Sequence, residues 1–150
     1  MKRSQTSGKN ASPRNPPRRG TPAVYQILPE KRVVIVKFGK VVTEKEIAEY
    51  ALSLRVDPVF DPEFSEIVDL REVQELDLRS DEMMELADKI DPFSIDAKRA
   101  FVVGDSAQAH AARIHQILRV SQDKISIFRS VEEAERWLGL RGQKLDFGEV

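Results

Sequence analysis

The feature that most constrains the fold is a regular alternation of short apolar segments with longer amphipathic ones. The short segments are rich in Val, Ile and Phe, which is typical of β-strands. The longer segments repeat their apolar residues at helical spacing, and each follows a Ser or Thr that can cap a helix. Strands that alternate with helices predict crossover connections and a largely parallel sheet.

The order of these segments predicts an α/β fold with the sequence of elements ββαβαβαβα. An opening antiparallel hairpin makes the sheet mixed, and four helices pack on it. The predicted strands are Val24–Pro29, Val33–Val42, Ile67–Leu70, Arg99–Val103 and Ile125–Phe128. The predicted helices begin after the capping residues Thr43, Ser80, Ser106 and Ser130.

Two of these helix starts carry a complete capping box. Thr43 is followed three residues later by Glu46, and Ser130 by Glu133. Gly139 is expected to cap the last helix at its C-terminus. The first helix should bury Ile47, Tyr50, Ala51 and Leu54, and the third Ala107, Ala111, Ile114 and Leu118.

Between the first helix and the next strand the chain repeats an Asp-Pro-x-Phe unit, first as Asp57–Phe60 and then as Asp61–Phe64. We interpret the repeat as two turns whose phenylalanines attach the loop to the core. Gly39 indicates a bulge or bend near the end of the second strand, and Leu76 is expected in a connection.

The charge is distributed unevenly. The net charge of −1 combines six basic residues and no acid in residues 1–22 with 18 basic and 25 acidic residues in the rest. Residues 1–22 also contain four of the eight prolines, so we predict a disordered basic tail. Three interpretations of this tail stay open: a solvated or over-long start, an arm that touches nucleic acid or anionic membrane, and a targeting peptide. We expect one folded domain over residues 23–139 and a flexible tail over 140–150.

Several classes of function lack the residues they need. The chain has no cysteine, so disulfides, thiolate metal sites and a cysteine nucleophile are excluded, and a cytoplasmic location is expected. His110 and His115 are five residues apart, a spacing that does not form a metal pair on a helix. Glycine-rich phosphate loops are absent. We therefore predict no metal and no cofactor.

Four stretches together resemble the SpoIIAA-like proteins of the STAS superfamily, the sulfate transporter and anti-sigma factor antagonist domains. They are Asp57–Phe64, Ile67–Val73, Arg99–Val103 and Ile127–Ala134. The resemblance covers about Val24 to Gly139. It implies the fold predicted above, and a relation to domains described with the lipid-binding SEC14 proteins.

The resemblance also implies where a regulatory site would lie. In anti-sigma factor antagonists, an Asp-Ser-Ser-Gly motif at the start of the second helix carries the phosphorylated serine. Aligned on the preceding strand, Asp77 takes the place of the aspartate, Leu78 and Arg79 those of the serines, and Ser80 that of the glycine. The acceptor motif is therefore absent as such, and Ser80 is explained first as a helix cap. We predict a regulatory or partner surface at Asp77, Arg79, Ser80 and Met84.

A second set of polar residues follows the carboxyl ends of the predicted parallel strands. It comprises Asp69, Arg71, Asp105 and Arg129. Open α/β sheets place their sites at this edge, so these residues form a second candidate site, although turn formation and helix capping also explain each of them.

These observations predict a non-enzymatic, regulatory protein-interaction module that presents its second helix to a protein partner. The alternative is a binder of a lipid or other apolar small ligand, since Met83, Met84 and Leu86 form a soft apolar surface. A third hypothesis is an enzyme that uses the acidic strand-end edge. Dimerisation through an exposed strand edge stays open.

Overall fold

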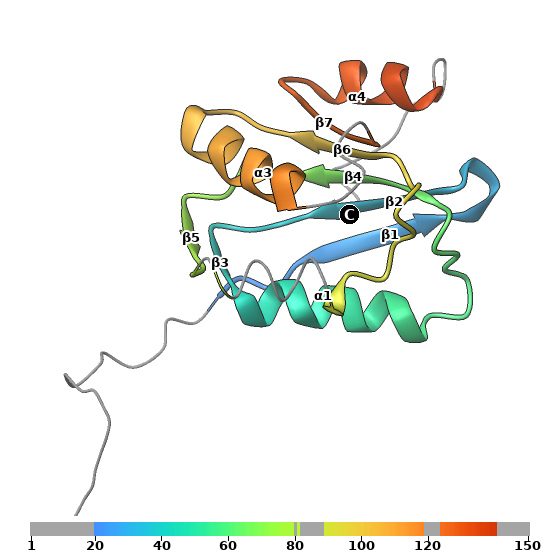
Figure 1. Ribbon diagram of the computed structural model, residues 1–150, viewed down its shortest axis with the longest axis horizontal. Helices are drawn as coiled ribbons and strands as arrows, with labels where there is room; N and C mark the ends of the chain where they lie inside the picture. The colour runs from blue at the N-terminus through green and yellow to red at the C-terminus, as the bar shows by residue number, and fades with distance from the viewer. Residues whose placement is uncertain (1–19, 80, 82–88, 119–123, 141–150) are drawn as a thin grey trace, which may run out of the picture.

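The computed structural model describes residues 20–79, 81, 89–118 and 124–140 of the 150-residue chain. Figure 1 shows a central sheet with helices packed around it. The elements are β1 (Val24–Leu28), the 3₁₀ helix η1 (Pro29–Lys31), β2 (Val33–Lys37), β3 (Val41–Thr43), α1 (Glu44–Val56), β4 (Ser65–Asp69), β5 (Glu75–Asp77), β6 (Arg99–Val102), α3 (Ser106–Leu118), β7 (Ile125–Phe128) and α4 (Val131–Leu138).

Five strands form one sheet in the order β1-β2-β4-β6-β7. β1 pairs with β2 in antiparallel orientation, and all other neighbours are parallel. The register places Ile67 between Ile35 and Ala100. The predicted mixed, largely parallel sheet with an opening antiparallel pair is therefore confirmed.

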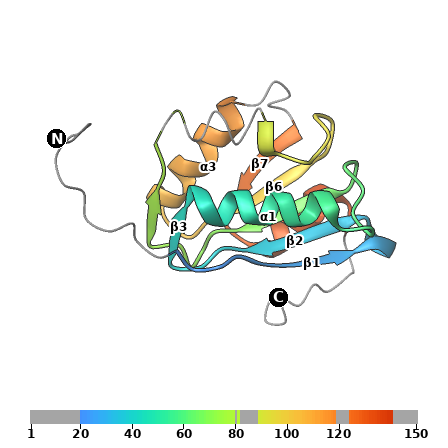
Figure 2. The ribbon, with the colours of Figure 1, turned by 90° about the horizontal axis from the view of Figure 1, so that it is seen from below.

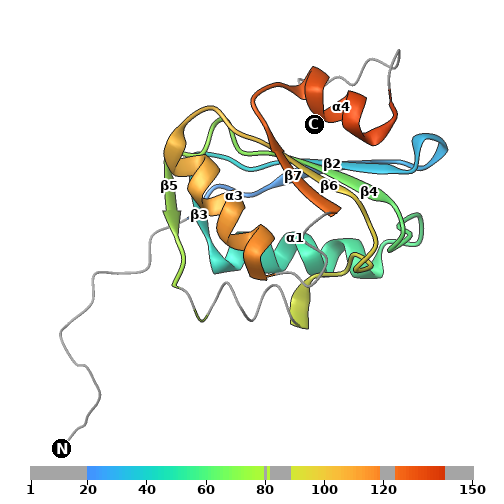
Figure 3. The same ribbon diagram turned by 45° about the horizontal axis from the view of Figure 1, so that its top comes forward.

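The sheet is buried on both faces because helices cover both. One core joins alternate residues of β2 and β4 to Tyr50 and Leu54 of α1 and Ala112 of α3. The opposite core contains the intervening strand residues and Ala134 of α4. Figure 2 shows α1 running alongside β1 and β2, and Figure 3 shows α4 on the other side of the sheet from α1. Burial on both faces explains why Val33–Val36 is an uninterrupted apolar run.

The predicted single strand Val33–Val42 is wrong, because the chain leaves the main sheet after Lys37. β3 instead pairs in parallel with β5 in a separate two-stranded sheet, so Leu76 lies in a strand and not in a connection. Gly39 lies at the break. A Cβ atom there would collide with the side chain of Thr21, whose backbone N–H donates to Val41 at 2.8 Å.

The local signals around α1 are confirmed. Thr43 caps the helix through its hydroxyl, which accepts from the N–H of Lys45 at 3.2 Å, while Glu46 accepts from the N–H of Thr43 at 2.7 Å. Tyr50, Ala51 and Leu54 are buried as expected, and Ile47 is partly buried and packs against the cluster that contains Tyr50 and Leu54.

Both Asp-Pro-x-Phe turns are also present. The carboxylates of Asp57 and Asp61 accept from the backbone N–H groups two residues on, at 3.0 and 2.9 Å. Phe64 is buried, and Phe60 packs edge-on against Phe64 and Phe93. The phenylalanines therefore attach the loop to the core, as predicted.

The predicted N-terminal caps of α3 and α4 need correction. Asp105 caps α3 in place of Ser106, because its carboxylate accepts from the N–H of Gln108 at 2.8 Å. The Ser130 hydroxyl does cap α4, but Glu133 reaches back to the N–H of Arg129 and not to that of Ser130.

The inner face of α3 is rotated from the predicted one, with Gln108 and Ala112 buried and Ala107 exposed. The amide of Gln108 explains its burial, since it bonds the backbone of Gly104 and Val73. The side chains of Ile114 and Leu118 lie outside the described set. Gly139 caps α4 in the left-handed conformation, with φ of 79°, as predicted.

Three helices are described where four were predicted. The predicted second helix, which contains Ser80, Met83 and Met84, lies largely outside the described residues, as do most of both predicted tails. Among the described helices, none is long and apolar enough to cross a membrane.

Removing the cap of α1 tests the local structure. We expect Thr43→Ala to lower the free energy of unfolding by roughly 0.5–2 kcal/mol, since it leaves first-turn N–H groups without their acceptor. Urea unfolding measures the change. Lys45→Ala, in the same turn but with an exposed side chain, is the control, and equal losses in the two variants would contradict the capping role.

Candidate functional site

The most distinctive feature of the interior is a buried ion pair between two neighbouring strands. Glu66 of β4 and Arg99 of β6 are register partners, and both side chains point to the face covered by α1. The Nε of Arg99 donates to Oε1 of Glu66 at 2.8 Å. Glu66 is 1% exposed and Arg99 5% exposed, so water does little to solvate either charge.

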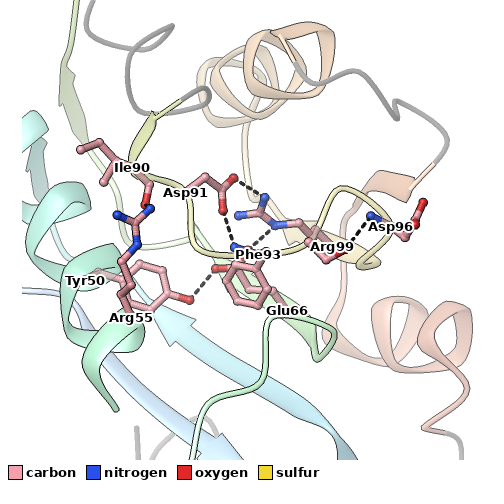
Figure 4. Close-up of polar contacts among 9 residues, drawn as sticks. Tyr50, Arg55, Glu66, Ile90, Asp91, Phe93, Asp96 and Arg99 are labelled. Atoms are coloured by element: carbon pink, nitrogen blue, oxygen red, sulfur yellow. Dashed lines mark hydrogen bonds and ion pairs between the residues drawn. The ribbon is translucent and has the colours of Figure 1, made fainter. Parts of the chain in front are cut away.

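Two further polar side chains complete this cluster, which we call the buried polar network (Tyr50, Glu66, Asp91 and Arg99). The hydroxyl of Tyr50 on α1 donates to Oε2 of Glu66 at 2.5 Å. Asp91, in the segment before β6, accepts from Nη1 of Arg99 at 2.5 Å. Figure 4 shows the guanidinium between the two carboxylates. The network thus joins α1, β4, β6 and that segment.

The network contains two carboxylates and one guanidinium, so its acidic charge is in excess when both acids are ionised. Burial raises the pKa of Glu66, and the second carboxylate, Asp91, raises it further, against the opposing effect of Arg99. Burial and the neighbouring Glu66 also raise the pKa of Tyr50 well above its ordinary value. Arg99 lies over the ring of Phe93, 4.6 Å from its centroid.

An apolar pocket opens beside the network, between α1, α3 and the sheet. Its volume is about 110 Å³. Three polar side chains of the network form part of its wall, and the rest of the described wall is apolar. The lining residues are Phe38, Val42, Ile47, Tyr50, Glu66, Val68, Leu70, Leu76, Leu78, Arg99, Phe101, Ala111 and Ala112. We call this space the apolar pocket.

A smaller groove, of about 60 Å³, adjoins the apolar pocket between β5 and α3. It shares Leu70, Leu76 and Ala111 with the pocket and continues to Val73 and Gln108. The small side chain of Ala111 lies where the two spaces meet.

The predicted strand-end site is brought together only in part. Asp69, which is 2% exposed, accepts two hydrogen bonds from the guanidinium of Arg71, each at 2.9 Å, and one from its backbone N–H at 3.0 Å. The bond to Asp69 raises the pKa of Arg71. Asp105 caps α3 instead, and Arg129 is exposed at the start of α4. Asp105 lies beside the Asp69–Arg71 pair, because Gln108, whose backbone N–H donates to Asp105, also donates its side-chain amide to the carbonyl of Arg71 at 3.2 Å. The strand-end site therefore stays a prediction.

The predicted regulatory surface is described only at its beginning. Asp77 is exposed at the end of β5, and Arg79 is exposed and pairs with Asp81 at 3.2 Å. Ser80 and Met84 lie outside the described residues, so the surface stays a prediction. No group of three or more His, Asp or Glu side chains suited to a metal was found among the described residues.

Sequence reasoning missed the buried polar network entirely. A signal was present: Glu66 and Arg99 each precede an apolar run at the start of a predicted strand. Had the two strands been placed side by side, opposite charges at matching positions would have indicated a pair. Tyr50 was expected in the core, but its hydroxyl needs a partner there, and this requirement pointed to a polar neighbour.

Comparisons with known proteins agree with this architecture. No family model matches the chain, and no curated protein matches it. Among solved structures, the chain is similar to an uncharacterized protein from the DUF3478 family with a SpoIIAA-like fold from Shewanella loihica PV-4. The TM-score is 0.57 at 17% sequence identity, and the match covers 78% of this chain and 94% of the other. The chain therefore has a SpoIIAA-like α/β fold, which confirms the fold implied by the resemblance.

Removing the cation of the buried polar network should be costly. Arg99→Met leaves Glu66 and Asp91 buried without their common partner, and we expect a loss of about 3–5 kcal/mol in the free energy of unfolding at pH 7. Urea unfolding measures it. Arg129→Met removes an exposed guanidinium and should change stability little, so similar losses in the two variants would disprove the role of Arg99.

The raised pKa of Glu66 predicts a pH dependence of stability. The folded state binds this proton more tightly than the unfolded state, so stability from Glu66 is present at low pH and is lost as pH rises through the folded pKa. We expect the wild type to gain stability relative to Glu66→Gln as pH falls from 7 toward 4.5, the ordinary pKa of a glutamate. The gain should be about 1.4 kcal/mol for each unit by which the folded pKa of Glu66 exceeds that ordinary value. Urea unfolding at several pH values measures this difference, and a constant difference would contradict the prediction.

Proposed function

We propose that this protein binds a small apolar ligand in the apolar pocket and does so without catalysis. The observation that carries the proposal is an apolar pocket between two helices and the sheet, whose described lining residues are apolar except for Tyr50, Glu66 and Arg99. Ligand sites in proteins have this character: mostly apolar walls with a few placed polar groups. Binding of an apolar small molecule, the alternative function predicted from the sequence, is thus the one favoured by the geometry.

The size of the pocket limits what can enter it. A cavity of roughly 150 Å³ is enough to hold benzene, so about 110 Å³ accommodates something smaller, such as a short part of an alkyl chain. A peptide helix, at about 10 Å across, is far too wide. The adjoining groove between β5 and α3 gives room for the rest of a longer molecule.

We propose no catalysis because the charged groups of the pocket wall are hydrogen-bonded to one another. Both oxygens of Glu66 accept hydrogen bonds, from Arg99 and from Tyr50. A general acid or base has to exchange a proton with the substrate, and these bonds hold the carboxylate against other protein groups. At the strand-end edge, Asp69 is held by Arg71 in the same way.

A second candidate function is the regulatory protein-interaction module predicted from the sequence. The observation that favours it is Leu76, which is 37% exposed on β5. This leucine precedes the predicted surface of Asp77, Arg79, Ser80 and Met84. An exposed leucine supplies an apolar anchor for a partner, but the same side chain also lines the apolar pocket, so small-ligand binding explains it equally.

Titration with 1-hexanol tests ligand binding. We expect saturable shifts of the backbone NMR signals of pocket residues such as Val68, Phe101 and Ala112. Ala111→Leu should weaken binding about tenfold or more, because the added carbons occupy the pocket. The control is Ala48→Leu, the same change at a partly exposed position of α1 outside the pocket. Absence of saturable shifts, or unchanged binding to Ala111→Leu, would overturn the proposal.

A further inference from the structure

We infer that the head group of the ligand is a hydrogen-bond donor, an amine or an alcohol, and that the pocket rejects carboxylates such as fatty-acid head groups. This inference rests on the proposed function and names the chemical class of its ligand. It is carried by the buried polar network, which supplies the polar side chains of the described pocket wall.

The polar groups of the wall are concentrated at one spot. Glu66 contacts both Tyr50, at 2.5 Å, and Arg99, at 2.8 Å, so these three lining residues form one connected patch. The other described lining residues are apolar. An amphiphilic ligand therefore has one place for its polar end, against this patch, and apolar surroundings for the rest.

The charge of the patch disfavours an anion. Arg99 is bound by two carboxylates, Glu66 and Asp91, at 2.8 and 2.5 Å. A third carboxylate would add a negative charge where the single guanidinium is already offset twice, in a place from which water is largely excluded. Phe93 also occupies the space beside the guanidinium, since its ring centroid lies 4.6 Å away.

The hydrogen-bonding capacity of the patch favours a donor. The hydroxyl hydrogen of Tyr50 is used on Glu66, and two of the five N–H groups of Arg99 are used on Glu66 and Asp91. Each oxygen of Glu66 accepts one bond and can accept a second, and the Tyr50 oxygen is an acceptor as well. An ammonium or hydroxyl group can donate to these acceptor oxygens. A carboxylate cannot, and it would depend on the remaining N–H groups of Arg99, whose charge two carboxylates already offset. Burial is the main cause of the raised pKa of Glu66, and the charge of Asp91 raises this pKa further.

The test compares three probes with the same six-carbon chain: hexylamine, 1-hexanol and hexanoate. Each is titrated into the full chain at pH 7 and equal ionic strength, and binding is followed by backbone NMR shifts of the apolar pocket residues. We expect the amine and the alcohol to bind about tenfold or more tightly than the carboxylate, because like charges in a desolvated site repel strongly.

Two variants connect this preference to the network. Glu66→Gln keeps the shape of the side chain and removes its charge, and it should reduce the preference for the amine over hexanoate several-fold. Glu72→Gln, which removes an exposed acid outside the described pocket wall, is the matched control and should keep the wild-type preference. Should Glu66→Gln fail to fold, Tyr50→Phe takes its place. It removes the donor that occupies Glu66, so amine and alcohol binding should be retained or strengthened while hexanoate stays weak.

The outcomes separate this inference from the proposed function. Hexanoate binding as tightly as hexylamine would overturn the inference while leaving apolar-ligand binding intact. An unchanged preference in folded Glu66→Gln would overturn it too, because the selectivity would then come from elsewhere. If none of the three probes binds, the proposed function itself fails, and the inference fails with it.

Discussion

The buried pair of Glu66 and Arg99 is the interaction on which the arrangement of the interior depends. Neither charge can remain in this core alone, so each fixes the position of the other. Pairing across adjacent parallel strands sets the register of β4 against β6, since a one-residue slip would turn one charge to the opposite face. Tyr50 extends the constraint to α1 and Asp91 to the segment before β6. The walls of the apolar pocket are held by the same bonds.

β4 is fixed at both ends by charge, on opposite faces. Glu66 and Asp69 are three residues apart, so the alternation of a strand directs them to different faces of the sheet. Glu66 points into the layer of α1, where its pair with Arg99 borders the apolar pocket. Asp69 is held by Arg71 at the carboxyl edge, where a two-residue separation makes the pair local. The local pair stabilises a strand end, whereas the long-range pair connects separate parts of the chain.

This difference between local and long-range contacts explains what the sequence could predict. The cap of α1, the two Asp-Pro-x-Phe turns and the antiparallel pairing of β1 with β2 follow from residues close together in the sequence, and they are confirmed. Glu66 and Arg99 are 33 residues apart, and only the tertiary arrangement joins them. The face of α3 was misplaced for a related reason: Gln108, polar by composition, is buried because distant backbone groups of the chain satisfy its amide.

The free-energy cost of burying the charges of the network points to a role beyond stability. A buried ion pair is often no more stabilising than well-packed apolar residues of the same volume, so stability alone is a weak reason for one in this core. Here the buried pair also forms part of the wall of a pocket, and the small side chains of Ala111 and Ala112 line the space beside it. Larger side chains at these positions would fill the pocket and add apolar contacts. A site that recognises a ligand with one polar end needs polar groups beside unfilled apolar space, and the network and the apolar pocket provide both.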